Sequence, residues 1–263
     1  MKRWQIIGVR MAVCWMAGGM AVTAGMVELD GQAEARVASG FTWRGTVVTE
    51  DPVFQPSVNL NGTHGGVRVW GTWDLTDSDE PVDRSRVDLS VFGRLEAGMA
   101  LLRGGAVAYL YHDGLYARNQ DTYEVFAECT LDVIGLPSVR VNYDISKLDG
   151  LYAQARVAHS FELMPDQWAM DVRLGIGLMD QAYAETQFTT RDAESGEVVY
   201  EPDGVVVSDF EASIEWPVFA GQWTVTPAVT YQTQLDSDVK DAVKAAGEAT
   251  DQWVVSLACG YTF

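Results

Sequence analysis

The last twelve residues, QWVVSLACGYTF (residues 252–263), decide the fold of this chain. Every second residue from position 253 is apolar or aromatic: Trp253, Val255, Leu257, Cys259, Tyr261 and Phe263. The residues between them are small or weakly polar. A period of two over this length predicts a β-strand with one face in an apolar medium and the other in a wetter place.

The strand ends on Phe263 with Tyr261 two residues before it. A soluble sheet gains little from such an ending, because exposed sheet edges are normally paired, charged or covered. A closed transmembrane barrel does gain, because its last strand must pair with its first. We therefore predict that Trp253, Tyr261 and Phe263 belong to a barrel-closing strand. The ending also resembles the terminal strand of Gram-negative outer-membrane barrels, which implies the barrel-assembly machinery as a partner.

The first 24 residues have the pattern of a secretory signal peptide. Met1, Lys2 and Arg3 form a charged start, a mostly apolar run follows, and small residues precede a cleavage position near Ala24. Arg10 interrupts the apolar run, which leaves the cleavage point open. No later segment has the ~18 continuous apolar residues of a membrane helix. We therefore predict a signal peptide over 1–24 and an exported domain over 25–263.

Alternation of apolar and polar residues places about twelve strands in that domain. We expect them near 33–43, 57–61, 67–75, 86–96, 101–111, 123–132, 139–145, 151–163, 168–176, 206–216, 223–231 and 253–263. The connections alternate long and short, as in barrels with short periplasmic turns and long outer loops. The fold class is therefore all-β, a transmembrane antiparallel up-and-down β-barrel of about 12 strands in the outer membrane. A soluble exported β-sandwich is the alternative.

Aromatic residues gather at two heights of the predicted strands, as amphipathic rings do at the two interfaces of a bilayer. This pattern favours the barrel over the sandwich and implies outer-membrane lipid as a partner. The set expected at one height is Phe41, Trp43, Trp73, Tyr109, Tyr123, Tyr143, Tyr231 and Trp253, and the set at the other is Trp168, Trp216, Trp223 and Phe263. Cys129 and Cys259 fall on outward positions of distant strands, so we expect two free thiols facing lipid.

The inward face of the predicted barrel carries many charges. A midplane arginine on the lipid side would cost ~2–4 kcal/mol, which fixes the assignment of faces. The predicted pore-lining residues are Arg36, Arg68, Arg86, Asp88, Arg94, Glu124, Glu128, Arg140, Arg156, Arg173, Asp209 and Glu211. A water-filled lumen of this kind predicts a narrow diffusion channel for small polar solutes. The alternative is a closed structural or adhesive barrel whose Arg–carboxylate pairs plug the lumen.

The overall charge is strongly acidic. Without the signal peptide, 15 basic and 37 acidic residues remain, a formal net charge of about −22. Such a field repels nucleic acid, so no nucleic-acid partner is expected. The inward carboxylates Glu124, Glu128, Asp209 and Glu211 predict that the pore prefers cations.

Residues 41–56 resemble the first strand and loop of the TorF-like porin family. The matching segments are Phe41-Thr42-Trp43-Arg44-Gly45 and the polar stretch with Pro and Gln from Thr49 to Pro56. Trp43 stands where the family more often has Phe, and the motif covers only residues 41–56 of the 263-residue chain. The resemblance implies an outer-membrane barrel of presumed pore function, without a cofactor and with an undefined solute.

Catalysis by the barrel is the third and weakest alternative. His159 and Ser160 are adjacent on one strand, so their side chains point to opposite faces and cannot form a nucleophile–base pair. The three histidines His64, His112 and His159 lie on separated elements, and the acidic loop 77–80 lacks the spacing of a calcium site. We therefore expect no enzyme activity, no cofactor and no metal. The sequence leaves open whether the loop 180–204 folds into the lumen.

Overall fold

The protein forms one closed antiparallel barrel of twelve strands. The computed structural model describes residues 19–20, 29–76, 85–111, 121–191, 198–245 and 247–263. The wall consists of β2 (Leu29–Ala38), β5 (Val53–Gly62), β6 (Gly65–Asp74), β7 (Arg86–Ala97), β8 (Ala100–Tyr111), β9 (Thr122–Leu131), β10 (Ser138–Asp144), β11 (Leu151–Met164), β12 (Trp168–Met179), β15 (Asp209–Glu215), β17 (Trp223–Gln234) and β18 (Asp251–Thr262). The short β16 (Val218–Ala220) continues the line of β15 beside β12 and β17. The prediction of an all-β barrel of about 12 strands is confirmed.

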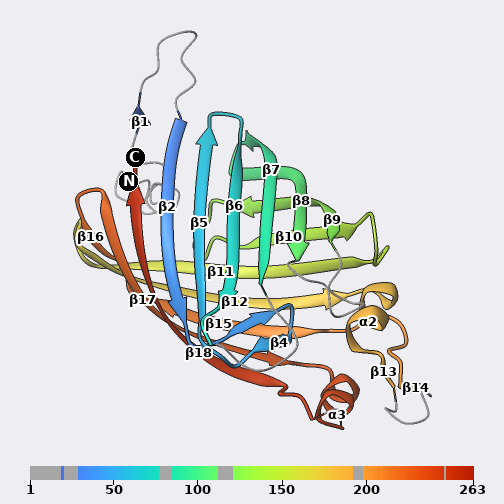
Figure 1. The fold of residues 1–263 in the computed structure, drawn as a ribbon. Helices are drawn as coiled ribbons and strands as arrows, with labels where there is room; N and C mark the ends of the chain where they lie inside the picture. Colours follow the sequence, from blue (N-terminus) through green and yellow to red (C-terminus); the bar gives the residue numbers. More distant parts are fainter. Residues whose placement is uncertain (1–18, 21–28, 77–84, 112–120, 192–197, 246) are drawn as a thin grey trace.

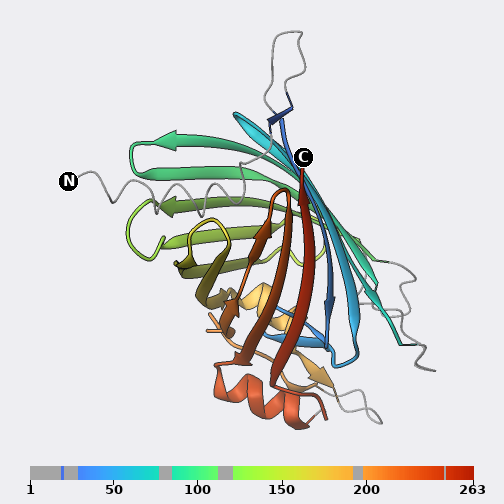
Figure 2. The ribbon, with the colours of Figure 1, turned by 90° about the vertical axis from the view of Figure 1, so that its left-hand side faces the viewer.

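The first and last wall strands close the barrel. β18 pairs with β2 along seven residue positions, from Ser256 opposite Ala38 to Thr262 opposite Gln32. Figures 1 and 2 show the C-terminus at one end of the wall and the helices α2 (Gln181–Phe188) and α3 (Ser237–Ala245) at the other. Short turns connect the strands at the C-terminal end, and the long connections lie at the helical end. In an outer-membrane barrel the end with long loops is the outer one.

The two faces of the wall differ as the alternation predicts. Along β7, Leu89 and Val91 are exposed on the outside, whereas Arg86 and Asp88 are buried within the lumen. Exposed apolar side chains recur at outward positions on neighbouring strands: Val58, Val67, Val69, Val125, Val139, Val157, Leu174, Val225, Val255 and Leu257. Such a band of apolar side chains fits the hydrocarbon core of a bilayer. Cys129 and Cys259 are free, and both lie at outward positions on separate strands.

The second wall strand is longer than the sequence indicates. It begins at Val53, not near Ser57, because the segment with Gln55 and Pro56 continues the strand β5. The β5–β6 ladder is interrupted opposite Gly71 and Thr72, so the missing N–H of Pro56 breaks no hydrogen bond to β6. Proline is tolerated in strands at such interruptions.

The first wall strand, by contrast, is shorter than predicted. β2 ends at Ala38, and Phe41–Trp43 form a separate strand β3, which pairs with β4 (Thr46–Thr49). Arg44 and Gly45 turn this hairpin with φ angles of +48° and +80°. Two successive positive φ angles are typical of a tight two-residue hairpin turn. The hairpin folds into the lumen, so the expectation that Phe41 and Trp43 lie in an outer aromatic girdle is wrong.

The face assignment of β8 also differs from the prediction. Val107 and Tyr109 are 4% exposed and face the lumen, so the expectation that Tyr109 lies among the aromatic residues at the bilayer interface is wrong. The pairing of β7 with β8 is continuous from Arg86 opposite Tyr111 to Ala97 opposite Ala100. Gly104 and Gly105 have no side chains, so the sequence does not show which residues of β8 face inward and which face outward at this point.

A small apolar cap covers part of the outer end. Helices α2 and α3 contribute Tyr183, Phe188 and Val239 to a cluster with Tyr152 and Met179 of the wall. Val206, at the start of the strand expected near 206–216, joins this cluster with 3% of its surface exposed. The two-stranded sheet of β13 (Thr190–Arg191) and β14 (Val198–Tyr200) follows α2.

Helix α2 begins at a defined cap. The Asp180 side chain accepts a hydrogen bond of 2.9 Å from the Tyr183 backbone N–H, which stabilises the first turn. None of the helices in the described part of the chain is long and apolar enough to cross a membrane. Of the predicted signal peptide, the structure describes only β1 (Gly19–Met20), which pairs with β2, and the cleavage position lies outside the described residues.

Candidate functional site: the lumen

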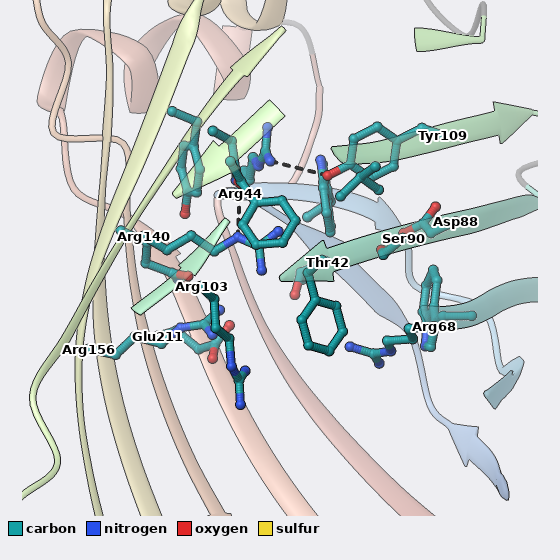
Figure 3. Close-up of a pocket in the computed structure, with 18 of the residues that line it drawn as sticks. Thr42, Arg44, Arg68, Asp88, Ser90, Arg103, Tyr109, Arg140, Arg156 and Glu211 are labelled. Atoms are coloured by element: carbon teal, nitrogen blue, oxygen red, sulfur yellow. Dashed lines mark hydrogen bonds between the residues drawn. The ribbon is translucent and has the colours of Figure 1, made fainter. Parts of the chain in front are cut away.

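The lumen contains a cavity of about 380 Å³ between the hairpin β3–β4 and the barrel wall. Its lining combines five arginines (Arg44, Arg68, Arg103, Arg140 and Arg156) with two carboxylates (Asp88 and Glu211), several aromatic rings and uncharged polar side chains. Figure 3 shows these charged side chains projecting from different strands toward one space. The surrounding contacts decide which of these charges is available to a solute.

The hairpin tip is held by a buried ion pair. Both terminal nitrogens of Arg44 donate to the two carboxylate oxygens of Glu124 on β9, at 2.6 and 2.7 Å. The side chains of Arg44 and Glu124 are 5% and 1% exposed. In a forked Arg–carboxylate pair of this kind, two charge-assisted hydrogen bonds neutralise the arginine, each stronger than a bond between neutral groups. The pair fixes the hairpin to the opposite part of the wall.

Three tyrosines complete the environment of Arg44. Its guanidinium donates to the hydroxyl groups of Tyr183 and Tyr109, and Tyr109 donates to Glu124 at 3.0 Å. The Arg44 guanidinium also lies over the ring of Tyr152, 4.4 Å from its centre. Burial raises the pKa of Tyr183 to about 12, so this phenol is neutral at physiological pH. Both terminal nitrogens of Arg44 are therefore directed at protein groups.

The hairpin also spans the lumen toward β15. A Cβ on Gly45 would lie 3.0 Å from Asp209 Cβ, so the turn is in close contact with that strand. Gln187 of α2 donates to the Thr46 hydroxyl at 2.6 Å. The hairpin is thus fixed to β9, β15 and α2 at once. Figure 1 shows the hairpin near the end of the barrel that carries the helices, which is the outer end.

A second buried pair supports the aromatic residues of the hairpin. Arg86 Nε lies 2.8 Å from an oxygen of Asp88, and its guanidinium lies 4.1 Å from the centre of the Trp43 ring. Trp43 in turn packs edge-on against Tyr109, with ring centres 5.5 Å apart. Arg86 and Asp88 thus neutralise each other and hold the hairpin in place.

Nearer the periplasmic end of the lumen, the carboxylate of Glu128 forms ion pairs with two arginines. Glu128 lies opposite Arg103 on one side and Arg140 on the other, in adjacent strands. The ion-pair distances are 3.6 Å to Arg103 and 3.5 Å to Arg140. Arg140 also lies flat over the Phe126 ring at 3.9 Å. This row retains a net positive charge while its side chains are held in position.

Arg68 and Arg156 differ from the other cavity arginines. Among the described residues neither forms an ion pair or a side-chain hydrogen bond, and both are exposed to the lumen space. The register explains why. Arg68 on β6 lies opposite Asn59 and Ser90. Arg156 on β11 lies opposite Ser138 and Gly175, and none of these four neighbours carries a charge.

The predicted pore-lining residues therefore separate into two groups. Arg68, Asp88, Arg140, Arg156 and Glu211 line the cavity. The others lie in the lumen but make contacts elsewhere: Arg36 pairs with Glu34 and Glu215, Arg173 pairs with Glu215, Arg94 donates to the Thr63 carbonyl at a short turn, Asp209 accepts from Ser208 and Tyr152, and Arg86, Glu124 and Glu128 form the pairs described above.

Some cavity residues are absent from the sequence-based set. Arg44 is one: the alternation places it on the inward face at the end of the first wall strand, and nothing in it indicates the hairpin. Arg103 is the other charged one, and the hairpin register offers a signal for it. With a turn at 97–100, Arg103 lies directly opposite Arg94, so both must share the inward face. The sequence also gives no indication that the aromatic residues Trp70, Phe92 and Phe126 line the cavity.

Metal binding and nucleophilic catalysis find no support in the described residues. No group of three or more His, Cys, Asp or Glu side chains there is placed to hold a metal ion. His159 contacts the Phe161 ring, with ring centres 4.6 Å apart, and His64 is exposed at a turn. His112 lies outside the described residues.

Comparison with known proteins supports the architecture. No protein-family model matches the sequence, and neither does any curated protein sequence. Among solved structures, the chain is similar to LpxR from Salmonella typhimurium, at 9% identity and a TM-score of 0.51 over 88% of this chain and 99% of that one. It is also similar to the NanC porin and the KdgM porin, at 8% and 9% identity and a TM-score of 0.48 for both. Each match covers 89% of this chain, and 98% of NanC and 99% of KdgM. At these identities the likeness concerns the fold, which is a closed twelve-stranded barrel of the outer-membrane type.

Proposed function

We propose that the protein is an outer-membrane channel for small polar solutes, narrowed at its outer end by the hairpin β3–β4. The observation that carries this proposal is the polar and charged cavity of about 380 Å³ within the lumen. A barrel that served only as a membrane scaffold would gain stability by filling this space with side chains. Channels instead line their lumen with charged groups that select solutes.

The charge of the cavity bears on selectivity. The cation preference expected from the sequence rests on four inward carboxylates. In the structure Glu124 and Glu128 are paired with arginines, and Asp209 accepts hydrogen bonds from Ser208 and Tyr152. Five arginines and two carboxylates line the cavity itself. We therefore propose that selectivity at this point of the lumen favours anions, in contrast to the overall charge of the chain.

Single-channel recording in a planar bilayer tests both parts of the proposal. The refolded chain, checked by a heat-dependent gel shift, should give discrete conductance steps. Under a salt gradient its reversal potential should show an anion preference, whereas a cation preference would support the sequence-based expectation. Removal of the hairpin anchor by Arg44→Ala should increase the step size, because the hairpin then no longer spans the lumen. Arg94→Ala, at a short turn, is the matched control.

A closed barrel is the second candidate, and the Arg44 network favours it. The hairpin contacts β9 and β15, which are separated by three wall strands, and also the helix α2. Wild-type protein that folds but does not conduct, together with a conducting Arg44→Ala variant, would identify a plugged barrel. Silence of both proteins would rule out the channel. Catalysis has no supporting side-chain arrangement among the described residues, so we propose no enzyme activity.

The resemblance of residues 41–56 to the TorF-like porins is part of this proposal. The segment holds the inward hairpin and not the end of a wall strand. Its aromatic-x-aromatic-Arg-Gly pattern gives the hairpin two rings for packing and a charged tip. Substituting the tip tests the role of the pattern through conductance.

A further inference from the structure

We propose that the lumen cavity contains a binding site for a small oxyanion, a carboxylate or phosphate group, held between Arg68 and Arg156. This inference deepens the proposed function, because it identifies the chemical class of solute that the lumen recognises. It also holds for a barrel that binds but does not conduct. The argument depends on the position, the pairing and the surroundings of these two arginines.

The two arginines lie on well-separated parts of the wall. Along the barrel, β6 and β11 are separated by the four strands β7 to β10, close to half of the circumference. Both side chains nevertheless line the same cavity, and Figure 3 shows them on opposite sides of it. A solute that enters this cavity therefore meets a guanidinium from each side.

The neighbouring residues leave both guanidinium groups available. The cross-strand neighbours Asn59 and Ser90 of Arg68 are uncharged, and Asp88 is occupied by Arg86. Beside Arg156, Gly175 leaves room for the arginine stem. A Cβ there would lie 3.4 Å from Arg156 Cγ. A planar guanidinium without a carboxylate partner is suited to forked recognition of an oxyanion.

One carboxylate opposes this arrangement. Glu211 lines the cavity, separated from Arg156 by Gly175 in the strand register. It forms no ion pair within 4.0 Å and no side-chain hydrogen bond among the described residues, so it offsets part of the positive charge. The row Arg103–Glu128–Arg140 adds one net positive charge on the same wall. The net charge around the cavity therefore remains positive. Because Glu211 reduces this charge, the site should bind a singly charged anion more readily than a multiply charged one.

The cavity also limits the size of the solute. Its volume of about 380 Å³ lies near the lower end of the ~300–1,000 Å³ that is typical of small-molecule sites. The rings of Trp70, Phe92 and Phe126 form apolar parts of the lining. A compact anion with a few carbon atoms fits this space, whereas a polymer can occupy it only with one unit at a time.

Isothermal titration of the refolded barrel in detergent micelles tests the proposal, with inorganic phosphate and succinate as probes at low ionic strength. At least one probe should bind saturably with one site per chain, and the comparison tells whether phosphate or carboxylate is preferred. Arg68→Gln and Arg156→Gln should each weaken binding at least ~10-fold, as expected for loss of a hydrogen bond to a charged group. Glu211→Gln should strengthen it.

Arg94→Gln is the matched control, because it removes the same charge at a turn outside the cavity. Absence of saturable binding for both probes would overturn the proposal. So would an equal loss of affinity in the control, because it would indicate only a general effect of charge. Conductance is measured separately. Binding without conductance would leave the anion site standing and remove the channel, whereas conductance without binding would remove only the anion site.

Discussion

Arg44 and the pair Arg68 and Arg156 line the same cavity but differ in every contact. Arg44 is buried, forms a forked pair with Glu124 and donates to two tyrosine hydroxyl groups. Arg68 and Arg156 are exposed to the lumen and lie opposite uncharged neighbours. The difference shows that a carboxylate within reach of the guanidinium decides the role of an inward arginine. With a carboxylate in reach it stabilises the structure, and without one it remains available to a solute.

Arg44→Ala should have the largest effect on stability. It leaves the Glu124 carboxylate buried without its counter-charge, which typically costs ~3–5 kcal/mol. Urea unfolding of the barrel in lipid vesicles measures this loss in the free energy of unfolding. Arg156→Ala should cost far less, since no ion pair is broken. A similar loss for both variants would contradict the distinction between the two kinds of arginine.

Tyr183→Phe should have the next largest effect. The phenol accepts a hydrogen bond from Arg44, and loss of a hydrogen bond to a charged group costs ~1.5–3 kcal/mol. The same variant tests the raised pKa of about 12 against the ordinary value of 10.0. The stabilisation due to neutral Tyr183 is complete below pH 10 and is lost as the pH rises toward 12. Urea unfolding at pH 9 and above pH 11 should therefore show a steeper decline for wild type than for the variant.

Gly150→Ala should weaken the contact between Tyr183 and Arg44 by displacing helix α2. A Cβ at this position would lie 2.6 Å from the Tyr183 backbone nitrogen, so α2 would have to move away from the wall. Such overpacking costs ~1–3 kcal/mol. Gly98→Ala is the control for the substitution itself, because no atom lies within 4 Å of its Cβ position, although its φ of +64° adds local strain. Only the Gly150 variant should increase the conductance.

Ser90→Glu should have the smallest effect on stability and the clearest effect on binding. It places a carboxylate directly opposite Arg68 in the register of β6 and β7. A solvent-accessible ion pair adds only ~0–1 kcal/mol to stability. The Arg68 guanidinium would however be neutralised, so titration with phosphate or succinate should show weaker binding. Ser90→Gln is the matched control, and unchanged affinity in Ser90→Glu would mean that Arg68 does not contact the anion.

The barrel and its two faces are predictable from the sequence, because a period of two is a property of each strand alone. The face of Arg68 or Arg156, for example, follows directly from its own strand. The pairing of these arginines does not, since it depends on the register between strands. Arg103 shows the limit most clearly, because Gly104 and Gly105 remove the alternation beside it.

The inward hairpin is the part that the sequence could not predict. Phe41 and Trp43 alternate with Thr42 and Arg44 as lipid-facing residues would, so their pattern fits the wall as well as the hairpin. The chain leaves the wall at Ser39 and Gly40, and the residues that hold the hairpin come much later in the sequence. The sequence does not reveal that β5 begins at Val53, for a related reason. Pro56 is read as a loop signal, and only the gap in the ladder to β6 permits it in a strand.

The long sequence separation of the hairpin contacts has a consequence for the order of assembly. Arg44 meets Glu124 across 80 residues and Tyr183 across 139 residues. The hairpin therefore cannot lock until β9 is in the wall and α2 has docked. Contacts between such distant residues form late, because a large loop must close before they do. The lumen of this barrel therefore narrows at the hairpin only after these later segments are in place.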